Sequence, residues 1–118
     1  MTGFIFVGLG GALGAMLRYA ISLVPYKNTF PLSTLIINII GALLIGYITG
    51  LAVKKDFSDN VILFLKTGLC GGFTTFSTFS LEAYNLFQSG NYGCAVLYIL
   101  LSVIGCIIGV WCGMSLAG

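Results

Sequence analysis

The sequence contains few charged residues and no histidine. Only 7% of its 118 residues are charged, with three acids against five bases, while 58% are hydrophobic. Soluble domains carry charge on about a quarter of their residues, so this chain cannot cover itself with a soluble surface. The lack of histidine, of a nucleophile–base pair and of paired carboxylates within an apolar stretch argues against an enzyme. The net charge of +2 is too small and too dispersed to predict nucleic-acid binding.

Three polar breaks divide the chain into apolar stretches. Both prolines lie in "PYKNTFP" (25–31), clustered charge lies in "KKDFSD" (54–59), and "QSGN" (88–91) has the composition of a turn. A membrane-spanning helix needs about 20 mainly apolar residues. We therefore expect an all-α membrane protein with one four-span domain over residues 1–118, with spans at Phe4–Val24, Leu32–Val53, Val61–Phe87 and Tyr92–Ala117.

The four cysteines all lie inside apolar spans, and none are spaced as CxxC. Free buried thiols that act as small hydrophobic residues are the first interpretation, and metal binding is the alternative.

The distribution of Lys and Arg sets the orientation of a membrane protein only weakly here. One side carries Lys54, Lys55 and Lys66, while the other carries Lys27 and Arg18. This near-even balance fits a weakly set single topology, and it equally fits a chain that inserts both ways and pairs with an inverted copy. Glycines spaced four apart, which favour close helix contacts within or between chains, occur at 10/14, 46/50 and 105/109/113.

The stretch "GLCGGFTTFSTFSLE" (68–82) places three glycines and five hydroxyl residues inside the third span. Glycine is unfavourable in a helix interior by about 1 kcal/mol relative to alanine. Because β-branched Thr74 and Thr75 follow the glycines, we expect a helix break between Gly71 and Phe76. Backbone groups freed by such a break typically bind ions. The alternative is a glycine-softened helix whose hydroxyls bond to their own turns.

Polar and aromatic residues form short tracks on three spans. Phe76 and Phe79 share a helical face, and their positive ring edges could attract a small anion, although simple packing is more common. Asn38 is the only amide of the second span, and it either bonds another helix or donates to a permeating anion. The remaining hydroxyl candidates are Thr34 one turn before Asn38, Ser77 and Thr78 beside the phenylalanines, and Tyr98 and Ser102 one turn apart.

Two charged residues inside spans are ambiguous. Glu82 is the only acid within a span and is a functional candidate for that reason, or it lies near the interface and is solvated. Arg18 either takes part in function or extends its charged head to the membrane surface.

These motifs together resemble the Fluc (CrcB) family of fluoride channels. The resemblance covers the whole chain, through "GGALGAMLRY" (10–19), "LSTLIINIIGALLIG" (32–46) and, most specifically, "GLCGGFTTFSTFSLE". It implies a fluoride-selective channel in the cell membrane that lets cytoplasmic fluoride leave passively and lowers its toxicity. It also implies an antiparallel, dual-topology dimer with two pores, formed by a self-pairing chain or as half of a paired heterodimer.

The resemblance further implies roles for particular residues. Phe76 and Phe79 are the pore rings, Asn38 is the pore amide, and Arg18 stands at the vestibule. A structural Na⁺ at the dimer interface is held by the backbone carbonyls of Gly71 and Thr74. The polar track of the pore consists of Thr34, Ser77, Thr78, Glu82, Tyr98 and Ser102.

Two other classes of membrane protein share part of this pattern. A small proton-coupled multidrug exporter also has four spans, but its chemistry needs a carboxylate in the first span, and the first acid of this chain is Asp56. A non-conducting assembly subunit has no need for aligned polar faces on three spans.

Overall fold

Helices make up nearly all of the chain that the structure describes. The computed structural model describes residues 1–25 and 30–118, so Lys27, which enters the charge balance, lies outside the described residues. The elements are α1 (Thr2–Ser22), α2 (Leu32–Lys55), α3 (Asp59–Ile62), the π-helix η1 (Leu63–Cys70), α4 (Gly71–Phe73), α5 (Phe76–Gln88) and α6 (Tyr92–Ala117).

The four predicted spans are confirmed. The apolar helical segments long enough to cross a membrane are Thr2–Ser22, Leu32–Lys55, Asp59–Gln88 and Tyr92–Ala117, and their limits differ from the predicted ones by only a few residues. The third span begins where the Ser58 hydroxyl accepts a hydrogen bond from the N–H of Val61, an ordinary N-terminal cap. The chain is thus a multi-pass membrane protein built from helices alone within its described part.

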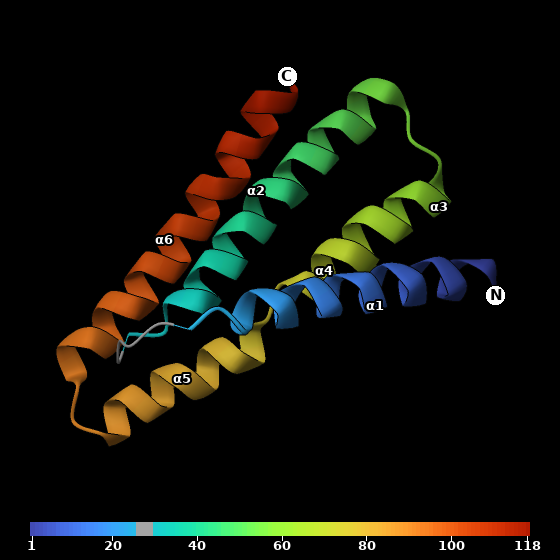
Figure 1. Ribbon diagram of the computed structural model, residues 1–118. Helices are drawn as coiled ribbons and strands as arrows, with labels where there is room; N and C mark the ends of the chain where they lie inside the picture. Colours follow the sequence, from blue (N-terminus) through green and yellow to red (C-terminus); the bar gives the residue numbers. More distant parts are fainter. Residues whose placement is uncertain (26–29) are drawn as a thin grey trace.

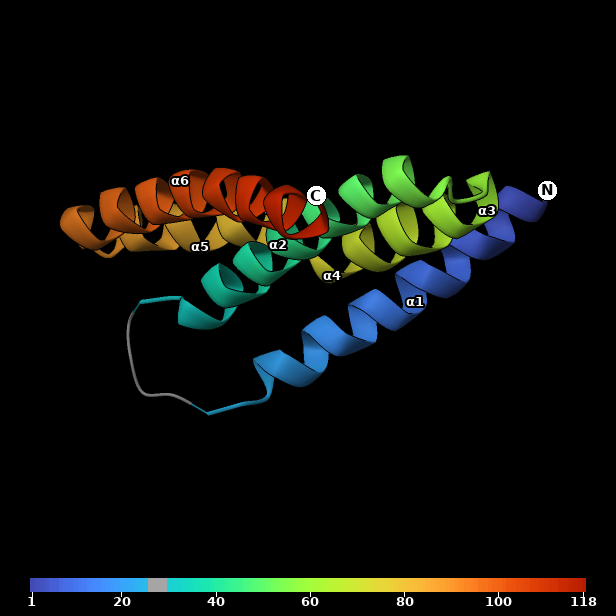
Figure 2. The same ribbon diagram turned by 90° about the horizontal axis from the view of Figure 1, so that it is seen from above.

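The third span changes its packing partner half-way along. Its first half, from α3 through α4, packs against α1, whereas α5 packs against α6, which in turn lies along α2 (Figures 1 and 2). The core between α2, α5 and α6 is a cluster of Leu35, Phe79, Ala83, Leu86, Ala95 and Tyr98. The chain measures 48 × 29 × 22 Å and is therefore a slab of helices that encloses little.

Glycines allow these pairs of helices to approach closely. A Cβ added to Gly10 or Gly14 of α1 would lie less than 3.0 Å from the backbone of η1 or α4, and one added to Gly72 would meet Gly11. Between α2 and α6, a Cβ added to Gly46 would meet the backbone of Val110, and one added to Gly113 would meet the backbone of Leu43. Small residues at such crossings let backbones touch. Several of the predicted glycine ridges therefore make contacts inside one chain.

The predicted helix break is confirmed, and it falls on the threonines rather than on the glycines before them. Gly71 is helical, with φ −62° and ψ −39°, and the helix ends two residues later. The extended residues are the two threonines, Thr74 with ψ 159° and Thr75 with φ −151° and ψ 117°. The neighbouring glycines pack against α1, as described above, so the unwinding falls on the β-branched residues that follow them.

The four cysteines are free thiols. Cys70 is buried and Cys106 is half-buried, but Cys94 lies exposed on the isolated chain, so the expectation of burial is wrong for Cys94. Among the described residues, no cluster of three or more His, Cys, Asp or Glu side chains could hold a metal ion.

Candidate functional site

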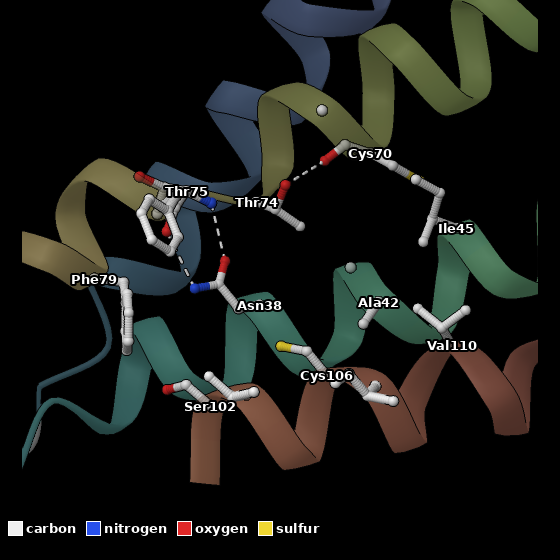
Figure 3. Close-up of a pocket in the computed structure, with 15 residues that line it drawn as sticks. Asn38, Ala42, Ile45, Cys70, Thr74, Thr75, Phe79, Ser102, Cys106 and Val110 are labelled. Carbon is white, nitrogen blue, oxygen red and sulfur yellow. Dashed lines mark hydrogen bonds between the residues drawn. The ribbon is translucent and has the colours of Figure 1, made fainter. Parts of the chain in front are cut away.

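A groove of about 430 Å³ lies where the break faces α2 and α6. Its walls come from the middle of α2, from the break and the start of α5, and from the middle of α6 (Figure 3). Six of the residues singled out from the sequence line it: Asn38, Gly71, Thr74, Phe76, Phe79 and Ser102. The groove is mostly apolar, and its few polar groups converge near the break, as is typical of binding sites for small ligands.

Asn38 holds the break through two hydrogen bonds to one residue. Its Nδ2 donates to the carbonyl oxygen of Thr75 at 3.1 Å, and its Oδ1 accepts from the Thr75 N–H at 2.9 Å (Figure 3). Because one bond needs a donor and the other an acceptor, the orientation of the amide is fixed by its partners. The second N–H of Nδ2 is left for another acceptor, so the pore role of Asn38 stays a prediction.

The break diverts the N–H groups that a continuous helix would use. The N–H of Thr75, which would bond the Gly71 carbonyl, bonds Asn38 instead. The N–H of Thr78, which would bond the Thr74 carbonyl, bonds the hydroxyl of Thr75 at 3.2 Å. The carbonyls of Gly71 and Thr74 are thus among those that lose their usual helical donors at the break.

Arg18 satisfies another carbonyl beside the break. Its Nε donates to the carbonyl oxygen of Gly72 at 3.2 Å, which joins α1 to the last turn before the break. Arg18 as a whole residue is half-buried. Because an arginine has five N–H donors, the remaining ones can still serve an anion.

Thr75 caps the helix that follows the break. Besides accepting from the Thr78 N–H, its hydroxyl donates to the Thr78 hydroxyl at 3.1 Å. A threonine at this position satisfies a backbone donor that the start of a helix leaves unpaired. α5 therefore begins at Phe76 because its cap is built into the sequence.

The aromatic rings form a continuous row from the groove to the core. Phe76 and Phe79 lie with ring centroids 5.5 Å apart and planes tilted by 43°, and Phe79 lies 5.1 Å from Tyr98. Phe79 is buried with 8% of its surface exposed, whereas Phe76 is 78% exposed on the isolated chain. The shared face predicted for the two phenylalanines is therefore present, with one ring in the core and one on the open side.

A hydrogen-bonded pair and an unpartnered hydroxyl lie along this row. The Tyr98 hydroxyl donates to Oε1 of Glu82 at 3.0 Å, which links α6 to α5. One turn further along α6, Ser102 is 6% exposed, and its hydroxyl has no hydrogen-bond partner among the described residues. A buried hydroxyl without a partner is unfavourable by about 1–3 kcal/mol, which indicates a site that takes a polar ligand or water.

The remaining predicted residues lie around the groove rather than in it. Thr34 is buried on α2, Ser77 is exposed at the start of α5, and Thr78 is half-buried beside Thr75. The sequence reasoning did not identify Thr75 or Gly41 as site residues, although both line the groove. A threonine directly before an aromatic helical run is a recognised helix-start signal and could have identified Thr75.

Comparison with known proteins identifies the family. Residues 5–114 match the family described as "CrcB-like protein, Camphor Resistance (CrcB)". The chain belongs to the CrcB family. The match covers most of the first and last spans of this CrcB protein, and all of the second and third, including the break and the groove.

Relatives of this CrcB chain share one name. A protein of Ruminiclostridium cellulolyticum named "Fluoride-specific ion channel FluC" is 50% identical over 121 residues, which cover 99% of this chain and 93% of that protein. Proteins of the same name from Azobacteroides pseudotrichonymphae and Helicobacter pylori (strain P12) are 48% and 44% identical. Those matches cover 85% and 97% of this chain, and 84% and 92% of the respective relatives.

Proposed function

We propose that this CrcB chain forms a fluoride-selective channel in the cell membrane that lets cytoplasmic fluoride leave passively. The observation that carries the proposal is the groove itself, where a buried, unpartnered Ser102 hydroxyl lies near the row of rings from Phe76 to Tyr98. The names of the relatives point to the same ion.

The chemistry of the groove suits a small, strongly hydrated anion. A pore must replace the water around such an ion and still release it. Hydroxyl and amide donors and the positive edges of aromatic rings bind more mildly than ammonium groups. The residues that line the groove include Ser102, Asn38 and the two phenylalanines but no lysine or arginine, so a permeating anion meets donors without a full positive charge.

We propose a structural Na⁺ held by two of the carbonyls that the break releases, those of Gly71 and Thr74. These two carbonyls lose their helical donors because Asn38 and the Thr75 hydroxyl take the N–H groups. Carbonyl oxygens are the hard ligands that such a cation prefers, and both residues line the open groove. When bound, the ion supplies partners for these carbonyls and a positive potential near the anion path.

The same geometry supports pairing with a second, inverted copy of the chain. A slab 22 Å thick with an open groove encloses no path by itself, and a two-fold axis through the break doubles each pair of carbonyls to four. Reporter tags on the C-terminus are expected on both sides of the membrane, because the Lys and Arg balance is nearly even. Tags found on one side only would contradict both the self-paired inverted dimer and the ion shared on its axis.

Fluoride efflux from liposomes tests the function directly. Liposomes loaded with fluoride or chloride and containing the purified protein are followed with ion-selective electrodes, with empty liposomes as the control. We expect rapid fluoride efflux and chloride efflux close to that of empty liposomes, because the groove offers small donors and no cationic ring. Comparable rates for the two anions would overturn the proposed selectivity.

The proton-coupled multidrug exporter receives no support. The relatives are named as ion channels, and α1 carries no carboxylate that could exchange protons. By the same names, the chain is a channel and not an enzyme.

A further inference from the structure

Gly41 lies directly against the first residue of the break. It is buried in the wall of the groove, three residues after Asn38 on α2. A Cβ added at this position would lie less than 3.0 Å from Cγ2 of Thr74, closer than real Cβ atoms approach a neighbour. The next nearest atoms, Cδ2 of Phe73 and Cβ of Thr74, would lie at 3.4 and 3.6 Å, which is ordinary contact. One methyl group therefore occupies the space that a side chain at position 41 would need.

Thr74 has little freedom to move away from such a side chain. Its N–H and its hydroxyl both donate to the carbonyl oxygen of Cys70, each at 3.0 Å. The N–H and the carbonyl of the next residue, Thr75, are both hydrogen-bonded to the Asn38 side chain. A side chain at position 41 must therefore push α2 and the break apart or displace Thr74. Either movement also displaces Phe76, which follows Thr74 by two residues.

We propose that Gly41 is a positioning residue for the ion path. By leaving room for the Thr74 methyl, it lets α2 approach closely enough for Asn38 to bond both backbone groups of Thr75. Positions three apart on a helix share a face, so Asn38 and Gly41 contact Thr75 and Thr74 side by side. The inference rests on the proposed function, because it assigns Gly41 an effect on the ion path only through the orientation of Phe76.

The experiment is a double-mutant cycle with a built-in rescue. Thr74→Ser removes Cγ2 and so clears the space. It keeps the hydroxyl that bonds the Cys70 carbonyl, and it keeps the backbone carbonyl of residue 74. Gly41→Ala alone is expected to lower fluoride efflux about tenfold or more, since displacements of about 1 Å at a functional site have effects of this order. In the Thr74→Ser background, the same change is expected to lower efflux by less than about twofold.

The matched control is Gly8→Ala on α1, where an added Cβ meets no atom within 4 Å. Its efflux is expected to equal that of the parent. Gel filtration and melting temperature are measured for every variant, so that efflux is compared between folded samples. Should Gly41→Ala alone fail to fold, recovery of folded, conducting protein in the double variant supports the inference, and failure to recover overturns it.

Two results overturn the inference while the proposed function stands. One is a Gly41→Ala variant that conducts like the parent and like Gly8→Ala. The other is an equal loss of efflux with and without Thr74→Ser, because the effect then does not pass through the methyl group. A parent protein that passes no fluoride is a different outcome, which overturns the proposed function and the positioning role together.

Discussion

Asn38→Leu is expected to abolish most fluoride efflux and to lower the melting temperature. Leucine has a similar volume but cannot bond Thr75, so a donor and an acceptor of the break lose their partner at a half-buried position. Leaving such a group unsatisfied lowers stability by about 1–3 kcal/mol. Because the break also orients Phe76, efflux is expected to fall by about a hundredfold. Electrode-recorded efflux and thermal melting of the purified protein provide the two measurements.

The two measurements separate the two roles of Asn38. A combined loss of stability and efflux supports the hold on Thr75. Lost efflux with an unchanged melting temperature supports instead a direct role of the amide in the pore. Ile36→Ala, at an exposed position of the same helix, serves as the control and should change efflux little. Parent-like values for Asn38→Leu in both measurements would contradict either role.

Phe76→Ile is expected to reduce fluoride efflux without disturbing the fold. Phe76 is 78% exposed on the chain, so replacing it should change stability by less than about 0.5 kcal/mol. The change keeps much of the volume but removes the positive ring edge. We expect roughly a tenfold loss of efflux, which corresponds to about 1.4 kcal/mol of lost attraction between the ring edge and the anion.

Two further variants control this result. Phe4→Ile on α1 removes a ring of similar exposure, 80%, away from the groove, and it should conduct like the parent. Phe79→Ile removes a buried ring that contacts both Phe76 and Tyr98, so it should lower stability as well as efflux. If Phe76→Ile conducts like Phe4→Ile, the ring edge of Phe76 is not part of the ion path.

The spans were predictable from the sequence, because hydropathy and polar breaks depend on composition alone. The break was also predictable, since "GGFTTF" interrupts an apolar run with residues that disfavour helix. Its position was not, because Gly71 and Thr74 both weaken a helix on propensity grounds. Contact with α1 decides between them: Gly72 is held as helix against Gly11, and the extended backbone moves to Thr74 and Thr75.

The candidate site was predictable in its residue types but not in its contacts. The isolated amide of Asn38 marked it as important, but only the fold places it opposite Thr75, 37 positions along the chain. The local sequence does not indicate the contact between Gly41 and Thr74, because a glycine in a spanning helix predicts close helix packing without naming the partner. Likewise, Tyr98 and Glu82 could each be singled out, while the bond between them depends on how α5 lies along α6.

The break in the third span also redistributes the electrostatic dipole of the helix backbone. A continuous helix carries its partial charges, each about half an elementary charge, at its two termini. Ending α4 at Phe73 and starting α5 at Phe76 creates a second pair of termini part-way along the span, one negative and one positive. Between Lys66 and Glu82 the chain has no charged side chain. The backbone alone can therefore favour a cation and an anion at neighbouring points within the membrane.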